Sequence, residues 1–238
     1  MSLSVLVTGA NRGIGLGIVQ QFLKNPSIAT IFATARNPEK ATELKSINDP
    51  RLHLIALDVD NDTSITQAFD KVNSVLGEKG LNVLVNNAGL WENYYPNKPA
   101  NRESFMRSLN VNCVSPLVMI QTFLPLLEKT TNPKVANLSS TLGSLERTTE
   151  GSGERGSIAY KTSKAALNMV GRVLAHDFAD KNIVVAQFCP GWVRTDMGGQ
   201  EAQLSVDEST QELANSILTL EKRHSGGFFM RNLKPIPF

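Results

Sequence analysis

Short apolar runs alternate with segments of helical periodicity along the chain. Where a strand is followed by a helix and another strand, the two strands pair in parallel and the helix packs on the sheet. Repeated alternation predicts one domain over residues 1–238, a doubly wound parallel sheet with helices on both faces. The strands are expected at Leu3–Thr8, Ile28–Ala35, Leu52–Leu57, from Val83, at Val135–Leu138, at Ile183–Phe188 and from Gly226. The helices are expected at Ile14–Lys24, shortly after Glu39, and at Ser64–Leu76, Arg102–Leu127, Tyr160–Phe178 and Val206–Leu220.

Two segments interrupt this regular pattern. Pro116 lies inside the long helical stretch of residues 102–127, and it is expected to bend that helix or to begin a new one within it. Residues 141–156 are rich in Gly, Ser and Glu and are expected to form a loop before the next helix.

Composition narrows the classes of function. The 238 residues are 41% hydrophobic and 19% charged, which suffices for a sizeable core. The net charge of +2, without a long basic run, gives no reason to expect nucleic acid or an anionic membrane as partner. No stretch is expected to reach the roughly 20 apolar residues of a membrane span. Cys113, Cys189 and the three histidines fit no metal spacing, so we expect no metal and interpret the cysteines as buried thiols of a cytosolic protein.

Glycines cluster between the first expected strand and the first expected helix, in the run Thr8-Gly9-Ala10-Asn11-Arg12-Gly13-Ile14-Gly15. Glycine lets the backbone turn sharply and approach a pyrophosphate, whose charge is favoured at a helix N-terminus. The strand–turn–helix context therefore predicts a dinucleotide site. The spacing is G-x-x-x-G-x-G, so the general G-x-G-x-x-G motif is not met literally.

The end of the second expected strand indicates which dinucleotide would bind. NAD-binding folds place an acid about 20 residues after the last glycine, where it contacts the ribose 2′-hydroxyl. Here that position is Ala35, and Arg36 follows it. An arginine binds a 2′-phosphate through charged hydrogen bonds, and Arg12 would add a second cation. NADP(H) is therefore predicted, although Arg36 as a solvated residue after a strand remains the alternative.

Tyr160 and Lys164 are four residues apart, on one face of an expected helix. Reduction of a carbonyl by hydride needs a proton for the oxygen, and a phenol with a pKa near 10 is a weak acid at neutral pH. A nearby ammonium favours the phenolate, so Lys164 is expected to lower the pKa of Tyr160. A Tyr-x-x-x-Lys pair alone is common on structural helices, but here it follows a nucleotide motif and a strand that ends at Ser139-Ser140.

These motifs together resemble the short-chain dehydrogenase/reductase family, whose Rossmann-type fold uses this glycine spacing. Asp58 and Val59 resemble the family's adenine contacts, Asn86-Asn87-Ala88-Gly89 its motif after the fourth strand, and Pro190–Thr195 its nicotinamide-side loop. That loop and the Pro235–Phe238 ending are similar to the sniffer-like carbonyl reductases. The resemblance implies that NADP(H) is bound by Gly9, Asn11, Arg12, Gly13, Ile14, Gly15, Arg36, Asp58, Val59, Asn87, Ala88, Gly89, Tyr160, Lys164, Pro190, Gly191, Val193 and Thr195.

The resemblance also implies a catalytic set of Asn112, Ser140, Tyr160 and Lys164. Ser140 would hydrogen-bond the substrate carbonyl and Tyr160 would donate the proton. Lys164 would hold the nicotinamide ribose and tune Tyr160, and Asn112 would support a proton relay through water to Lys164. Ser139 is the alternative to Ser140, because adjacent residues point opposite ways; the family pattern selects the second serine.

The implied function is NADPH-dependent reduction of an aldehyde, ketone or quinone. A non-catalytic NADPH-binding module would be expected to lose the tyrosine or the lysine, and a methyltransferase of similar fold would need neither. Apart from the small-molecule substrate, the resemblance suggests a homo-oligomer, dimer or tetramer, packed through the long helices.

The substrate pocket is expected to be open, because only the short stretch from Met197 to Leu204 follows the nicotinamide-side loop. The alternative is that the polar segment Arg147–Arg155, or a neighbouring subunit, covers the site. Trp91 and Trp192 either line this pocket or serve in packing.

Overall fold

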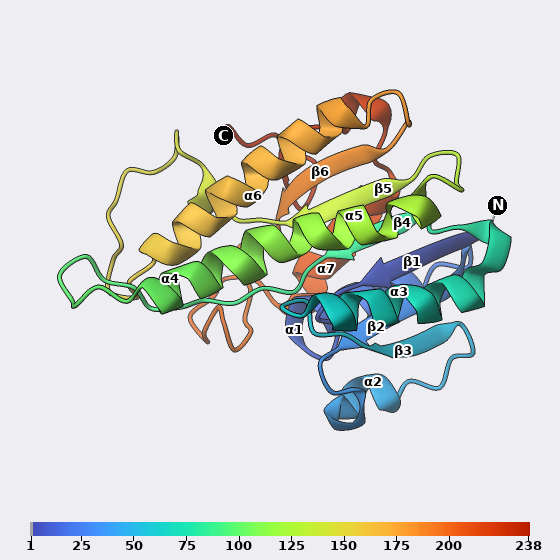
Figure 1. Ribbon diagram of the computed structural model, residues 1–238. Coiled ribbons are helices and arrows are strands. Elements are labelled where there is room, and N and C mark those ends of the chain that lie inside the picture. The colour runs from blue at the N-terminus through green and yellow to red at the C-terminus, as the bar shows by residue number, and fades with distance from the viewer. Residues whose placement is uncertain (1) are drawn as a thin grey trace.

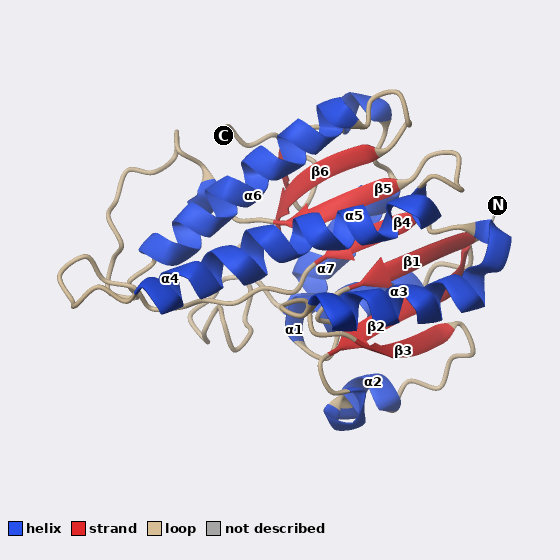
Figure 2. Cartoon of the chain, in the orientation of Figure 1, coloured by secondary structure: helices blue, strands red, loops and turns tan. Residues whose placement is uncertain are grey.

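The computed structural model describes residues 2–238, which form a central sheet between two layers of helices (Figure 1, Figure 2). Seven parallel strands lie in the order β3-β2-β1-β4-β5-β6-β7, and this confirms the predicted doubly wound α/β fold. The strands are β1 (Leu3–Val7), β2 (Ile28–Ala35), β3 (Leu52–Ala56), β4 (Val83–Asn86), β5 (Lys134–Leu138), β6 (Val184–Cys189) and β7 (Phe228–Met230).

Helices α3 to α6 cover the sheet face turned toward the viewer in Figure 1, and α1 and α7 cover the opposite face. The helices are α1 (Gly13–Leu23), α2 (Thr42–Lys45), α3 (Asp62–Leu76), α4 (Arg102–Leu109), α5 (Ser115–Leu127), α6 (Ile158–Asp177) and α7 (Val206–Leu218). Shorter segments are η1 (Pro38–Lys40), η2 (Gly77–Lys79), η3 (Asn110–Val114), η4 (Thr141–Gly143) and η5 (Lys222–His224).

Strand β1 shows why both faces of the sheet are buried. Val5 and Val7 belong to the core shared with α1 and α7, whereas Leu6 belongs to the core shared with α3 and α5. Successive strand side chains point to opposite faces, so a strand between two helix layers is apolar at most positions, and β1 departs from this only at the buried Ser4. The near-continuous apolar runs in the sequence follow from this requirement.

The strand order creates a crevice at one edge of the sheet. The chain winds outward from β1 to β3, then returns to place β4 on the other side of β1. The connections after β1 and β4 therefore leave the sheet in opposite directions. Ligands of open α/β sheets bind at this point, beside the carboxyl ends of the strands.

The long helical stretch of residues 102–127 is interrupted where the sequence predicted a new start. Segment η3 is a π-helical turn, and α5 begins directly after it with Pro116 in its first turn. Proline has no N–H to donate to the carbonyl of Asn112, four residues back, so the regular α-helical bond is missing there. π-turns often occur at functional sites, and this one contains the candidate residue Asn112.

This stretch corrects one sequence expectation. Its 26 residues form one helical run with a mean hydropathy of 1.4 in its most apolar window, so it is long and apolar enough to cross a membrane. Polar residues scattered along the stretch interrupt its apolar run, so it holds no 20 consecutive apolar residues although its mean hydropathy is high. Half of that window is buried inside the protein, as in the core helix of a folded domain.

Element boundaries differ from prediction by a few residues. Helix α3 begins at Asp62 instead of Ser64 because the Asn61 side chain accepts a hydrogen bond from the Ser64 amide, at 2.8 Å, and caps the helix. Helix α6 begins at Ile158, before Tyr160.

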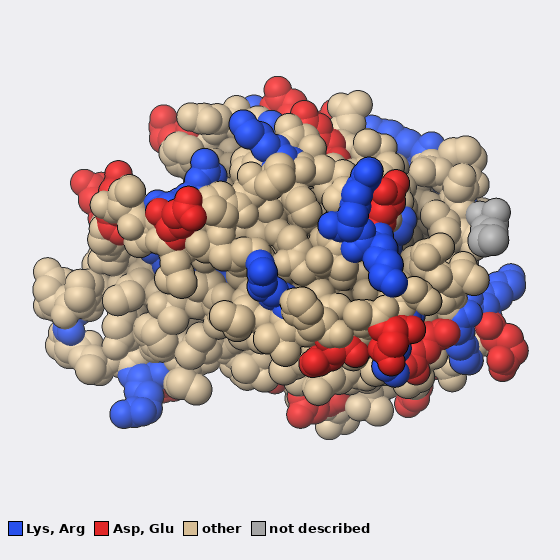
Figure 3. Space-filling model, turned by 90° about the horizontal axis from the view of Figure 1, so that it is seen from above, with Lys and Arg blue, Asp and Glu red and all other residues tan. Residues whose placement is uncertain are grey.

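On the face seen from above in Figure 3, acidic and basic side chains are dispersed among uncharged surface.

Candidate active site

A cavity of about 760 Å³ opens at the carboxyl ends of the strands. This is within the range of pockets that hold small molecules and cofactors. Most predicted site residues line it: Gly9, Asn11, Arg12, Gly13, Ile14, Gly15, Arg36, Asp58, Val59, Asn87, Ala88, Gly89, Tyr160, Lys164, Pro190 and Thr195. Among the described residues, Asn112, Ser140, Gly191 and Val193 are outside its lining.

The lining also contains Ser139, the alternative to Ser140, and Arg194 and Met197 from the nicotinamide-side loop and the stretch after it. The other lining residues were not singled out by the motifs: Glu43, Leu57, Asp60, Leu90, Arg107, Val111, Leu138, Asp196 and Val206. For Arg107 and Val111 a signal existed, since they lie four residues apart on one helical face just before Asn112. Asp196 directly follows the nicotinamide-side loop, but its contact with Arg12 had no signal in the sequence, because the two residues are 184 positions apart.

Two glycines of the first turn are required by geometry. Gly9 has φ +63°, and a Cβ on it would lie 3.0 Å from the Ala88 Cα. A Cβ on Gly15 would lie 2.3 Å from the Gly9 carbonyl oxygen. Within the described helix α1, no side chain caps the N-terminus and the first turn holds no acid. This end of α1 therefore fits the diphosphate of a dinucleotide.

Thr8 and Asn87 join the glycine turn to the end of β4. The Thr8 Oγ1 accepts hydrogen bonds from the amides of Asn87 and Ala88, both at 3.0 Å. The Asn87 side-chain amide donates to the carbonyls of Thr8 at 2.8 Å and Gly9 at 3.1 Å. These bonds hold the two sides of the crevice in register, which accounts for an asparagine directly after β4.

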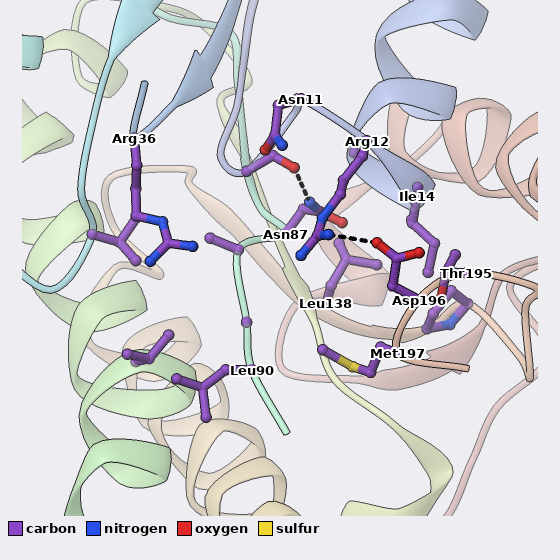
Figure 4. Close-up of a pocket in the computed structure, with 18 of the residues that line it drawn as sticks. Asn11, Arg12, Ile14, Arg36, Asn87, Leu90, Leu138, Thr195, Asp196 and Met197 are labelled. Atoms are coloured by element: carbon purple, nitrogen blue, oxygen red, sulfur yellow. Dashed lines mark hydrogen bonds and ion pairs between the residues drawn. The ribbon is translucent and has the colours of Figure 1, made fainter. Parts of the chain in front are cut away.

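Arg12 and Arg36 approach the cavity from opposite sides (Figure 4). Arg36 follows β2, as predicted. Arg12 reaches across to Asp196, and the two form an ion pair of 2.5 Å with side chains 67% and 75% exposed. Exposed ion pairs contribute little free energy. A phosphate can therefore replace Asp196 as the partner of Arg12 at small cost.

Asn112 is fully buried behind the segment that follows β4. Its Oδ1 accepts from the Leu90 amide at 2.9 Å, and its Nδ2 donates to the Leu90 carbonyl at 2.9 Å and to Ser163 Oγ at 3.0 Å. The side chain thus ties the Gly89–Leu90 segment to helix α6, which carries Tyr160 and Lys164.

Lys164 is buried, and its Nζ donates to the Leu138 carbonyl at 2.7 Å. Burial lowers the pKa of Lys164 to about 8, because apolar surroundings disfavour the ammonium. The same Nζ is 5.6 Å from the centroid of the Tyr160 ring. The predicted pair therefore meets at the cavity, with the ammonium directed to a backbone carbonyl.

Burial raises the pKa of the Tyr160 phenol above its ordinary value, and the nearby Cys189 adds to this rise. The Ser140 hydroxyl and the charge of Arg155 act in the opposite direction. The predicted lowering by Lys164 is not found, since Lys164 is itself buried and bonded to Leu138. The phenol consequently carries its proton at neutral pH.

The two serines after β5 have different surroundings. Ser139 is buried, and its hydroxyl donates to Asn168 Oδ1 at 2.6 Å. Ser140 is partly exposed, and its Oγ accepts from the Leu142 amide at 3.2 Å. The Ser140 hydroxyl also interacts with the Tyr160 phenol, whose pKa it lowers, and this proximity to the candidate proton donor supports the second serine as the candidate.

The loop after β6 is held by its own backbone and by Leu204. The Arg194 amide donates to the Leu204 carbonyl at 2.8 Å, and the Leu204 amide donates to the Trp192 carbonyl at 3.1 Å. The Trp192 indole donates to the Gly198 carbonyl at 2.7 Å and remains half exposed. These bonds place Thr195 and Met197 against the cavity.

Two segments cover Tyr160, and we call residues 91–95 and 152–157 together the Tyr160 cover. The Tyr94 amide donates to the Gly156 carbonyl at 2.7 Å, and the Tyr95 hydroxyl donates to the Glu154 carbonyl at 2.9 Å. Gly156 has φ +55°, and a Cβ there would lie 2.9 Å from the Tyr94 nitrogen. The expectation of an open cleft is wrong on this side, because Trp91 stacks on Tyr160 and Arg155 lies on the outer face of Trp91.

The chain is similar to known proteins in both sequence and structure. A model of the family described as short chain dehydrogenase matches residues 4–204. The short-chain dehydrogenase anuI of Penicillium roqueforti is 34% identical over 223 residues, covering 89% of this chain and 87% of its own.

Two crystal structures match the whole chain over their own full length. One carries the name carbonyl reductase Sniffer of Caenorhabditis elegans, with 46% identity and a TM-score of 0.92. The other is the NADPH-bound carbonyl reductase from chicken fatty liver, with 33% identity and a TM-score of 0.94. The resemblance to sniffer-like carbonyl reductases is thereby confirmed.

Proposed function

Since the chain belongs to the short-chain dehydrogenase family, we propose that it reduces aldehydes, ketones or quinones with NADPH. The observation that carries this proposal is that Tyr160 and Lys164 line the same cavity as the glycine turn. Residues 1–238 act as one dinucleotide-binding catalytic domain. The NADPH-bound chicken carbonyl reductase, which shares the fold over its full length, supports the choice of cofactor.

The residues that would hold NADPH are distributed along the cavity. The diphosphate would bind at the N-terminus of α1, where Gly9 and Gly15 leave the space that a Cβ would fill. Arg36 and Arg12 would bind the 2′-phosphate. When bound, NADPH supplies the hydride that the carbonyl carbon accepts.

Tyr160 is the proposed proton donor. As the carbon–oxygen π electrons move to the carbonyl oxygen, the Tyr160 Oη proton passes to that oxygen, and an alcohol results. The Ser140 hydroxyl orients the oxygen by a hydrogen bond. Lys164 would bind the cofactor ribose, and Asn112 holds the Leu90 backbone and the Ser163 hydroxyl by hydrogen bonds. The part of Asn112 in a proton relay to Lys164 stays a prediction.

The test is the loss of NADPH absorbance in the presence of aldehydes, ketones and quinones. Turnover of at least one class, abolished in the Tyr160→Phe variant, would support the proposed function. Tight NADPH binding without turnover of any compound in the panel would instead favour a non-catalytic NADPH-binding module.

We place the protein in the cytosol as a homo-oligomer. Both cysteines are buried and unpaired in the described chain, as is usual in a reducing compartment. Helices α4 to α6 expose the apolar side chains of Met106, Met169 and Val173, which suits packing between subunits. Sedimentation of the unmodified protein distinguishes a dimer or tetramer from a monomer.

The Arg36→Asp variant should lose its preference for NADPH over NADH. A charged hydrogen bond to the 2′-phosphate contributes about 1.5–3 kcal/mol, or one to two decades in affinity, and an aspartate would repel the phosphate. The measurement is the pair of dissociation constants from fluorescence titration. Lys40→Asp is the matched control, because Lys40 is exposed in the same segment and lies outside the lining. Equal binding of NADPH and NADH by the unmodified protein would contradict the role of Arg36.

A further inference from the structure

Three side chains from three segments form a stack at the site. The Trp91 and Tyr160 rings have centroids 4.5 Å apart, and their planes are 28° from parallel. The Arg155 guanidinium carbon is 4.4 Å from the Trp91 ring centroid. Stacked aromatic rings attract one another, and a guanidinium is attracted to the face of an indole. Trp91 is therefore the central member that joins Arg155 to Tyr160.

Hydrogen bonds fix the positions of Arg155 and Trp91 in this stack. The Arg155 Nη2 donates to the Met197 carbonyl at 2.7 Å. The Trp91 indole N–H contacts Asn93 Oδ1 at 2.9 Å and the Arg155 carbonyl at 3.2 Å. Arg155 thus connects the Tyr160 cover to the cofactor-side loop, and its own backbone helps to orient Trp91.

Arg155 is one of several charged and polar groups around Tyr160. The titratable and polar groups that face the phenol are Lys164 on the same helix, Arg155 in the cover, Cys189 at the end of β6 and Ser140 at the end of β5. Lys164 directs its ammonium to the Leu138 carbonyl. The charge of Arg155 favours the phenolate, in opposition to burial, which raises the pKa of Tyr160.

We propose that Trp91 and Arg155 are positioning residues for Tyr160: Trp91 holds the ring and excludes water, and Arg155 supplies a positive charge near it. The effect on turnover rests on the proposed function of Tyr160, whereas the effect on its ionisation does not. Because one residue buries the phenol and the other favours its anion, their loss shifts the ionisation of Tyr160 in opposite directions. A cover that merely packed would expose Tyr160 on either substitution and shift both in the same direction.

The test is an ultraviolet titration of phenolate in the cofactor-free protein. The chain has 3 tyrosines, so subtracting the spectrum of the same protein carrying Tyr160→Phe isolates Tyr160. Trp91→Ala should bring the ionisation of Tyr160 down toward the ordinary phenol value of about 10. Trp91→Phe should restore it, because a phenyl ring can still stack. In Arg155→Met, Tyr160 should ionise at a higher pH than in the unmodified protein, because a charge that favours the phenolate is lost.

Arg147→Met is the matched control for the loss of a cation, since Arg147 is exposed in the same loop and makes no contribution to the pKa of Tyr160. Unchanged ionisation, or ionisation at lower pH, in Arg155→Met would overturn the charge role of Arg155. Unchanged ionisation in Trp91→Ala would overturn the shielding role of Trp91. In turnover, Trp91→Ala should lower kcat several-fold to about tenfold, the range of one aromatic pair. If the titrations give the expected shifts but no carbonyl compound is reduced, the roles of Trp91 and Arg155 are supported and the proposed function is contradicted.

Discussion

Replacing Tyr160 with phenylalanine should lower turnover by about 10²–10⁴, the usual contribution of a general acid. The phenylalanine ring keeps the buried position and the contact with Trp91, so only the hydroxyl proton is lost. NADPH affinity should therefore stay within a few-fold of the original. The measurements are single-turnover oxidation of NADPH in the presence of substrate and a separate binding titration.

This variant also separates chemistry from folding. Because the substitution leaves the packing of α6 intact, thermal unfolding of the variant should match that of the unmodified protein. A fully active Tyr160→Phe protein would contradict the proton transfer proposed above. A variant that unfolds or no longer binds NADPH would show that Tyr160 is needed for the structure of the site.

The Lys164→Met variant should lose both turnover and cofactor affinity. Lys164 is buried beside Gly89 and Tyr160, where a charged hydrogen bond to the ribose contributes about 1.5–3 kcal/mol, or one to two decades in the dissociation constant. Loss of a preorganised charge beside the reacting groups lowers turnover by a further 10²–10³, roughly as for one oxyanion donor. Lys181→Met is the matched control, since Lys181 pairs with Glu128 and lies outside the cavity lining.

The pH dependence of cofactor binding gives an independent measurement of Lys164. With its pKa lowered to about 8 by burial, Lys164 is an ammonium below that pH and increasingly a neutral amine above it. A ribose oxygen binds the charged form better, so the NADPH dissociation constant should be flat below pH 8 and should rise above it. Lys164→Met should remove this rise. If the NADPH dissociation constant of the unmodified protein does not change up to pH 10, this would argue against contact between Lys164 and the cofactor.

Local patterns in the sequence were sufficient to predict the strands and helices and much of the nucleotide side of the site. A strand buried on both faces is apolar at most positions, and a helix on the sheet needs apolar residues at helical spacing, so both can be recognised from the sequence. The glycine turn is equally local, because its function depends on the backbone of a few consecutive residues. Tyr160 and Lys164 could be paired in advance since the helix itself places them on one face.

Contacts between distant segments could be seen only in the tertiary structure. Asp196 pairs with Arg12 from 184 residues away, and the motifs in which the two residues lie do not predict that contact. The stack of Arg155 on Trp91 and of Trp91 on Tyr160 likewise depends on the closure of two loops around Gly156. The sequence placed Lys164 near Tyr160, but the position of its Nζ depended on the Leu138 carbonyl at the end of another strand. Residue type and spacing along the chain thus determine which elements form. The direction of a buried charge and the cover over a reactive group depend on the through-space partners that folding brings within a few ångströms.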